Sequence, residues 1–225
     1  QIGKGGVVAG GVVATCRNRR WNDPRNPKPF LSVLLDKAFQ WMVPGAKRVL
    51  WYEGYNVYND SSQCSQLISA LQERGYIVVA DGTMPITPDL LLGYDIVVIP
   101  QLQLGAPGSG GDPGQLPDAD VQALKSFVEE GGGLLVLDGS DWGGYNFFRV
   151  QNKILEAVGF GLRFQSDQVT DSTSQWGTDF RPIADVMGDV LEPYQAETGT
   201  SEIGIYSICW NSYPCIWIFL NKKTT

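Results

Sequence analysis

Histidine is absent from all 225 residues of the chain, and this absence excludes more chemistry than any other feature of the sequence. Triad hydrolases need an imidazole that takes and returns a proton near neutral pH, and many zinc and iron sites need imidazole ligands. Basic residues are also few: 17 Lys and Arg stand against 24 Asp and Glu, a net charge of −7. Nucleic acid and anionic membrane surfaces are therefore poor candidate partners. No apolar run reaches the roughly 18 residues of a membrane-spanning helix, so none is predicted.

Cysteine is scarce too, and no two of the four cysteines have the C-x-x-C spacing of a zinc or redox site. Cys209 and Cys215 lie between two β-rich runs, a pattern typical of a hairpin closed by a disulfide. Cys16 and Cys64 would then form the second disulfide; the alternative is four buried, reduced thiols. Asn59 begins the one N-glycosylation sequon, in a polar turn. With a first residue that is not Met, these features favour a piece of an exported protein, extracellular or at a cell surface.

Apolar runs alternate with amphipathic segments along the chain. Strands are expected at 7–14, 48–52, 76–80, 95–100 and 134–137. Helices are expected at 30–42, from Ser61 or Ser62 to Gly75, from a cap at Asp118 to Gly131, and at 148–159. Continuously apolar strands between helices indicate a parallel sheet covered on both faces. The sequence therefore predicts an α/β fold: a flavodoxin-like three-layer sandwich with a mostly parallel sheet and a C-terminal β-hairpin at 202–220.

Open parallel sheets bind ligands beyond the carboxyl ends of their strands, where the winding direction reverses. In a flavodoxin-like order, the strands at 48–52, 95–100 and 134–137 lie side by side. Their ends carry the candidate ligand-binding residues Glu53, Gln101, Asp138, Ser140, Asp141 and Trp142. Such carboxylates could coordinate Ca²⁺ or Mg²⁺ or hold a polyol, while Trp142, Tyr55 and Tyr145 could stack on a sugar. The alternative is that Asp138 and Asp141 cap the following helix and that Glu53 is solvated.

Three segments resemble one known fold. They are LPDADVQALKSFVEEGGGLLVL at 116–137, YDIVVIP at 94–100, and residues 47–58. Together they are similar to the class I glutamine amidotransferase-like fold over residues 46–165. The resemblance is to its non-amidotransferase branch, which includes trehalose-utilisation-like proteins and modules of surface and gliding proteins. True amidotransferases of this fold place a cysteine nucleophile after the strand that ends here at Leu137, with His and Glu partners. Asp138 occupies that position, and Ser140 has no base beside it, so the resemblance does not imply glutamine hydrolysis.

The resemblance divides the chain into two parts. Residues 46–225 are expected to form the amidotransferase-like α/β domain. Residues 1–45, a strand plus a helix, resemble the closing strand and last helix of such modules. They are either the remnant of an upstream module or the completion of this module's sheet.

The leading functional hypothesis is a non-catalytic module of an exported or surface protein that acts in assembly or in glycan or protein binding. Its expected partners are protein neighbours, a glycan, or further copies of the chain. One alternative is a hydrolase or carbohydrate-modifying enzyme that uses carboxylates, with or without a divalent metal. Another is a structural subunit of a filament or surface layer. No cofactor is expected, unless Ca²⁺ or Mg²⁺ binds the acidic strand ends.

Overall fold

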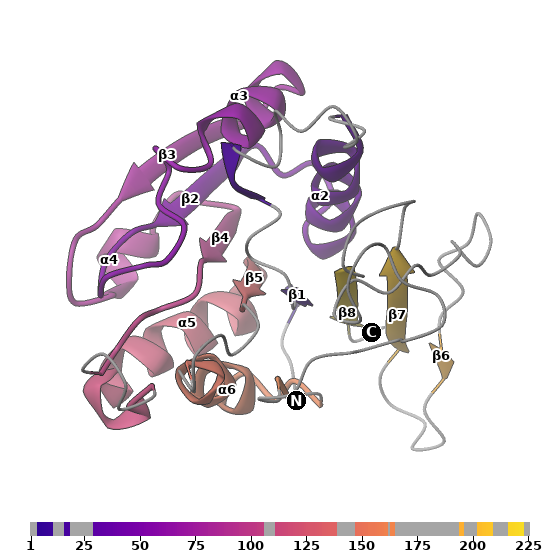
Figure 1. Cartoon of the computed structure of the whole chain (residues 1–225). Helices are drawn as coiled ribbons and strands as arrows, with labels where there is room; N and C mark the ends of the chain where they lie inside the picture. Colours follow the sequence, from indigo (N-terminus) through magenta and orange to yellow (C-terminus); the bar gives the residue numbers. More distant parts are fainter. Residues whose placement is uncertain are drawn as a thin grey trace, which may run out of the picture.

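The structure is a computed structural model, and it has the predicted α/β architecture of a mostly parallel sheet between two helical layers (Figure 1). It describes residues 4–10, 16–18, 29–105, 111–138, 147–161 and 163–164, and the backbone at 194–195, 202–208 and 216–222. In this part of the chain no helix is long and apolar enough to cross a membrane.

The strands and helices follow the sequence pattern closely. The strands are β1 (Gly6–Gly10), β2 (Arg48–Tyr52), β3 (Ile77–Asp81), β4 (Ile96–Ile99), β5 (Gly133–Leu137), β6 (Tyr194–Gln195), β7 (Glu202–Ile208) and β8 (Ile216–Lys222). The helices are α2 (Pro29–Met42), α3 (Ser65–Glu73), α4 (Pro88–Leu91), α5 (Asp118–Glu130) and α6 (Phe148–Ala157), with a 3₁₀ turn η2 (Pro113–Gln115). The pattern missed only the shortest elements, α4, η2 and β6, because four residues or fewer carry no periodicity.

The strand order in the sheet is β3-β2-β4-β5-β1-β8-β7-β6. The strands from β3 to β1 run parallel, and β8 and β7 add antiparallel strands beyond β1. The predicted neighbours β2, β4 and β5 are confirmed, and β7 with β8 forms the predicted hairpin. After β2 the chain moves outward to β3 and then returns to β4 on the other side of β2. The winding direction therefore reverses between β2 and β4, which places the switch point at the ends of these two strands.

The amino-terminal strand β1 lies inside the sheet, between β5 and β8. Val7 is in register with Leu134 of β5, and the helix that follows, α2, packs close to β1. A Cβ at Gly6 would lie only 2.8 Å from the Cα of Met42, so glycine at this position allows the close approach of α2. The strand of residues 1–45 thus shares one sheet with the strands of residues 46–225.

Two apolar clusters fill the space between the sheet and the helical layers. Along each strand, successive side chains point to opposite faces. Val8, Val49 and Leu135 belong to the cluster under α2 and α3, whereas Leu50 and Val136 belong to the cluster under α4, α5 and α6 (Figure 1). Burial of each such side chain contributes about 1.5–3 kcal/mol, so both faces of the central strands stabilise the fold.

The expectation that the strand at 76–80 is covered on both faces is wrong. This strand, β3, is the last strand at one end of the sheet, and Ile77 and Ala80 on it are exposed. An apolar run predicts a strand equally well at the edge and in the centre of a sheet, so the sequence pattern could not distinguish the two.

Two helix caps also differ from expectation. Helix α3 begins at Ser65 rather than after Ser61 or Ser62, because the Asp60 carboxylate accepts hydrogen bonds from the Ser62 hydroxyl at 2.6 Å and the Gln63 amide at 2.8 Å and holds a separate turn. Asp118 is not the cap of α5: Pro117 occupies that position, and the Asp118 carboxylate lies 2.8 Å from Lys153 Nζ of α6.

Candidate functional site

Two predicted site residues, Gln101 and Asp138, meet at the carboxyl ends of β4 and β5. Gln101 Nε2 donates a hydrogen bond of 2.7 Å to Asp138 Oδ1. Both residues are buried, with 6% and 1% of their surface exposed. The Asp138 amide donates to the Gly10 carbonyl at 2.9 Å, which joins the end of β1 to the same corner. The alternative that Asp138 caps the next helix is wrong, since α6 begins only at Phe148.

A third buried polar side chain, Gln151 of α6, binds the same two strand ends. Its Nε2 donates to the Pro100 carbonyl at 2.9 Å and to the Leu137 carbonyl at 2.8 Å. Buried polar groups need such partners, so Gln151 positions α6 beneath the site. Sequence reasoning missed Gln151, although a glutamine between the buried Val150 and Ile154 was a usable signal.

Glu53, the predicted site residue at the end of β2, is half-buried and makes separate contacts. Its carboxylate accepts a hydrogen bond from the Ser61 amide, and its own amide donates to the Asp81 carbonyl at 2.8 Å. The alternative that Glu53 is simply solvated is therefore wrong. Glu53 orders the turn between β2 and α3 and links β2 to the end of β3.

The loop after β2, residues 53–60, crosses the end of β4 and thereby covers the switch point. The Tyr58 amide donates to the Gln101 carbonyl at 2.9 Å, and the Gln103 amide donates to the Asn56 carbonyl at 3.0 Å. Tyr55 and Asn56 have φ values of 59° and 56°, in the left-handed region that favours glycine. This conformation costs roughly 1–2 kcal/mol at a residue such as Tyr55, so the surrounding contacts must hold the loop in place.

The strongest of these contacts is made by Asp120, in the first turn of α5. Its Oδ2 accepts hydrogen bonds from the Tyr55 hydroxyl and from the Ile86 amide, each at 2.7 Å. Asp120 is fully buried, and within the described chain neither its Oδ1 nor the buried Tyr52 hydroxyl has a hydrogen-bond partner. Asp120 thus joins α5, the loop over the switch point and the segment before α4. No pattern in the sequence distinguishes Asp120 from the exposed Asp118 two residues earlier.

The electrostatics of this cluster keep its phenols protonated. Burial, together with the hydrogen bond to Asp120 and its negative charge, raises the pKa of Tyr55 to about 12. Burial also raises the pKa of Tyr52 well above its usual range, and Tyr55 and Asp120 add to this effect. Neither phenol is suited to take a proton near neutral pH, because an effective general base needs a pKa close to the working pH.

On the opposite face, residues 16–18 dock against the start of α3. Asn18 Oδ1 accepts from the Gln66 amide at 3.0 Å, and its Nδ2 donates to the Ser62 carbonyl and the Ser65 hydroxyl, each at 2.9 Å. Since Cys64 at the cap position makes no side-chain hydrogen bond to the helix, Asn18 caps α3 from a distant part of the chain.

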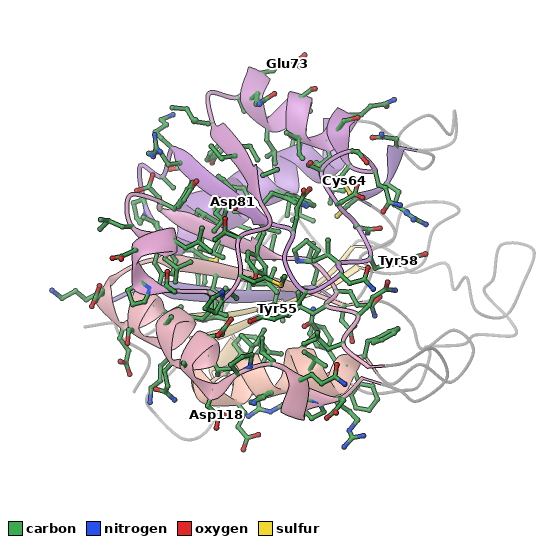
Figure 2. The ribbon with its side chains drawn as sticks, turned by 90° about the vertical axis from the view of Figure 1, so that its left-hand side faces the viewer. Tyr55, Tyr58, Cys64, Glu73, Asp81 and Asp118 are labelled. Carbon is green, nitrogen blue, oxygen red and sulfur yellow. The ribbon has the colours of Figure 1, made fainter. Side chains whose placement is uncertain are left out.

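Arg17 extends the docking of residues 16–18 to the loop over the switch point. Its Nη1 donates to the Tyr58 hydroxyl at 3.0 Å, and its guanidinium carbon lies 4.4 Å from the centroid of the Tyr58 ring. Figure 2 shows Tyr55 and Tyr58 in the same part of the molecule.

The structure brings together the two cysteines that were expected to pair, Cys16 and Cys64, as buried thiols. The hydrogen bond with Cys16 is the largest cause that raises the pKa of the Cys64 thiol, and burial adds to it. Both are free thiols in this structure, and the expected disulfide bond between them is not formed. Neither cysteine lies at the bend after β5, where the resemblance would place a nucleophile.

The sequon at Asn59 does not fit this fold as a glycosylation site. Asn59 is fully buried, and its carbonyl oxygen accepts a hydrogen bond of 3.1 Å from Trp51 Nε1. The polar turn packs onto β2 instead of projecting into solvent, so a glycan on the Asn59 amide would require the turn to open.

Several predicted residues lie outside the described part of the chain: Ser140, Asp141, Trp142, Tyr145, Cys209 and Cys215. Among the residues that are described, no three Cys, Asp or Glu side chains form a group that could hold a metal ion. Comparisons with protein-family models, with curated proteins and with solved structures found no match to the chain.

Proposed function

We propose that the chain is a non-catalytic amidotransferase-like module of an exported or cell-surface protein, acting in assembly or in glycan or protein binding. The observation that carries this proposal is the state of Asp138. By resemblance it stands where amidotransferases have their nucleophile, yet its carboxylate is buried and hydrogen-bonded to Gln101 at 2.7 Å. A nucleophile must instead be exposed to substrate and activated by a base, and the chain has no histidine to provide one.

The loop over the switch point supports the binding part of the proposal. Tyr55 and Tyr58 keep part of their surface accessible, and Asn56 between them is exposed. Asp120 and Gln101 hold this loop from below. Binding to a surface that is already ordered loses little conformational entropy, and tyrosine rings present both an apolar face and a hydroxyl to a glycan or a protein.

The test combines a binding measurement with a turnover measurement on the whole chain. Glycan binding is measured on an array of immobilised neutral and acidic oligosaccharides. Protein binding is measured by cross-linking the chain to extracellular proteins of the source cells. Glu53→Gln and Trp142→Ala change two of the predicted ligand-binding residues, and the Gln side chain retains an acceptor for the Ser61 amide. Glu130→Gln is the matched control, because it removes the same charge at the far end of α5. We expect the chain to bind a glycan or a protein. Glu53→Gln and Trp142→Ala should each weaken this affinity about tenfold, and the control should leave it unchanged.

The turnover measurement follows ammonia release from glutamine and reducing-sugar release from the oligosaccharides that bind. We expect neither above background. Turnover that Glu53→Gln abolishes would establish the carboxylate-based hydrolase instead, and loss of that turnover with EDTA would make it metal-dependent. If the chain bound no glycan and no protein in these measurements, the proposal that it is a binding module would be overturned.

A further inference from the structure

The outer side of β3 is an open strand edge with an apolar sequence. β3 ends the sheet, and no strand in the described part of the chain pairs with its outer side (Figure 1). Its sequence is Ile-Val-Val-Ala-Asp, in which Ile77 and Ala80 are exposed and the other residues are half-buried. Proteins usually protect such edges with Lys, Pro or a bulge, since an open edge is a template for another strand. β3 contains neither Lys nor Pro.

The backbone of β3 shows which of its groups face outward. The Ile77 amide donates to the Lys47 carbonyl at 2.7 Å, and the Asp81 carbonyl accepts from the Glu53 amide at 2.8 Å. In a parallel ladder, alternate residues direct both backbone groups toward the same neighbour. Residues 77, 79 and 81 therefore face β2, whereas Val78 and Ala80 direct their N–H and C=O groups away from the sheet.

An exposed apolar side chain, Ile77, lies at the start of this edge. In the described part of the chain, Ile77 is 53% exposed and Leu92, just after α4, is 81% exposed. Arg48 of β2, the register partner of Ile77, donates to the Gly93 carbonyl at 2.7 Å, which places the turn at Leu92 by the start of β2, the strand next to β3. The edge thus offers apolar surface beside its open backbone groups.

The charges at the two ends of β3 have opposite signs. Lys47 Nζ lies at the start, 5.9 Å from the centroid of the Tyr76 ring. Asp81, labelled in Figure 2, is the last residue of β3, and hydrogen bonds from Thr83 lower the pKa of its carboxyl group, so it is ionised at neutral pH. In an antiparallel pair of two such strands, the start of one lies beside the end of the other, so each lysine approaches a carboxylate.

We propose that two copies of this chain associate through β3, which pairs antiparallel with β3 of the second copy about a two-fold axis at Val79. Val78 and Ala80 of each copy exchange N–H···O=C hydrogen bonds, and Ile77 packs across the interface. Lys47 of each copy faces Asp81 of the other. The contact is isologous, so it closes with two chains and joins their sheets into one. This proposal is independent of the function proposed above.

The decisive variant is Ala80→Pro. Proline removes the outward N–H of residue 80 and leaves the hydrogen bonds between β2 and β3 intact, and proline is tolerated at such edge positions. Ala80→Ser is the matched control, because it keeps the N–H group. Light scattering after gel filtration, or sedimentation equilibrium, at about 1–100 µM measures the dimer. We expect Ala80→Pro to raise the dimer dissociation constant about tenfold or more and Ala80→Ser to leave it unchanged.

Thermal melting reports whether Ala80→Pro is folded. If Ala80→Pro is not folded, Lys47→Glu tests the interface instead. Lys47→Glu should weaken the dimer at low salt, and the double variant Lys47→Glu with Asp81→Lys should restore the dimer. A wild-type chain that stays monomeric over this concentration range would overturn the proposal. The proposal would also be overturned if the folded Ala80→Pro variant formed a dimer as stable as that of the wild type. If Ala80→Pro does not fold, the same result for Lys47→Glu would overturn it.

Discussion

The two helical layers are joined to distant segments of the chain by hydrogen bonds in different surroundings. On the side of α4 and α5, the fully buried Asp120 carboxylate binds Tyr55 and the Ile86 amide. On the side of α3, the half-buried Asn18 binds the start of the helix. A polar group that loses its partner at a buried site stays unsatisfied, whereas water can replace the partner at a site that is open to solvent. Similar hydrogen bonds are therefore expected to differ in their importance for stability.

The largest expected effect is that of Asp120→Ala. The buried Ile86 amide and the half-buried Tyr55 hydroxyl both lose their acceptor, so we expect the free energy of unfolding to fall by about 2–4 kcal/mol. Urea unfolding measures the change. The control is Asp118→Ala two residues earlier, where an 89% exposed carboxylate loses only its ion pair with Lys153, at a cost of about 1 kcal/mol or less. Equal losses in the two variants would contradict the contrast between the layers.

A smaller effect is expected for Asn18→Ala, which removes the cap of α3. Because water can reach the freed helix amides, the loss should be about 1 kcal/mol, typical of a helix cap. Asn18→Asp retains the acceptor for the Gln66 amide and should recover much of this loss in the same urea measurement. If Asn18→Ala destabilised the chain as strongly as Asp120→Ala, the two layers would not differ in the proposed way.

The smallest effect is a change in the response of stability to alkaline pH. The pKa of Tyr55 is raised to about 12 in the folded chain, above the value near 10 of an unfolded tyrosine. The folded state therefore holds this proton more tightly, and its contribution is complete below pH of about 10 and is lost as the pH rises toward 12. In Tyr55→Phe, the fall in unfolding free energy over this interval should be shallower than in the wild type. The same slope in both chains would show that the Tyr55 proton is not involved.

The sheet could be predicted because its information is local. Continuous apolar runs identified β2, β4 and β5, and glycines such as Gly75 and Gly131, with φ of 89° and 120°, mark the helix ends that were expected. The rule for strand ends also brought Gln101 and Asp138 together correctly. The strands and helix ends depend on residues close in sequence, and the meeting of Gln101 with Asp138 follows from the strand order alone.

The remaining features depend on contacts between distant segments. Asn18 caps a helix amide 48 positions later, and Tyr55 finds its acceptor 65 positions away in Asp120. No periodicity or spacing in one sequence connects such residues. The turn at Asn59 has the composition of an exposed loop, and only its packing against Trp51 shows that it is buried.

The place of β1 has a consequence for the order in which the chain assembles. β1 precedes the other described strands in the chain, but its neighbours β5 and β8 follow far along the sequence, with Val8 paired to Leu135 on one side and Leu220 on the other. The strands β2 to β5 can associate through connections that are much shorter. Closing the longer loops costs more chain entropy and slows folding, so the middle of the finished sheet is the part that a nascent chain completes late.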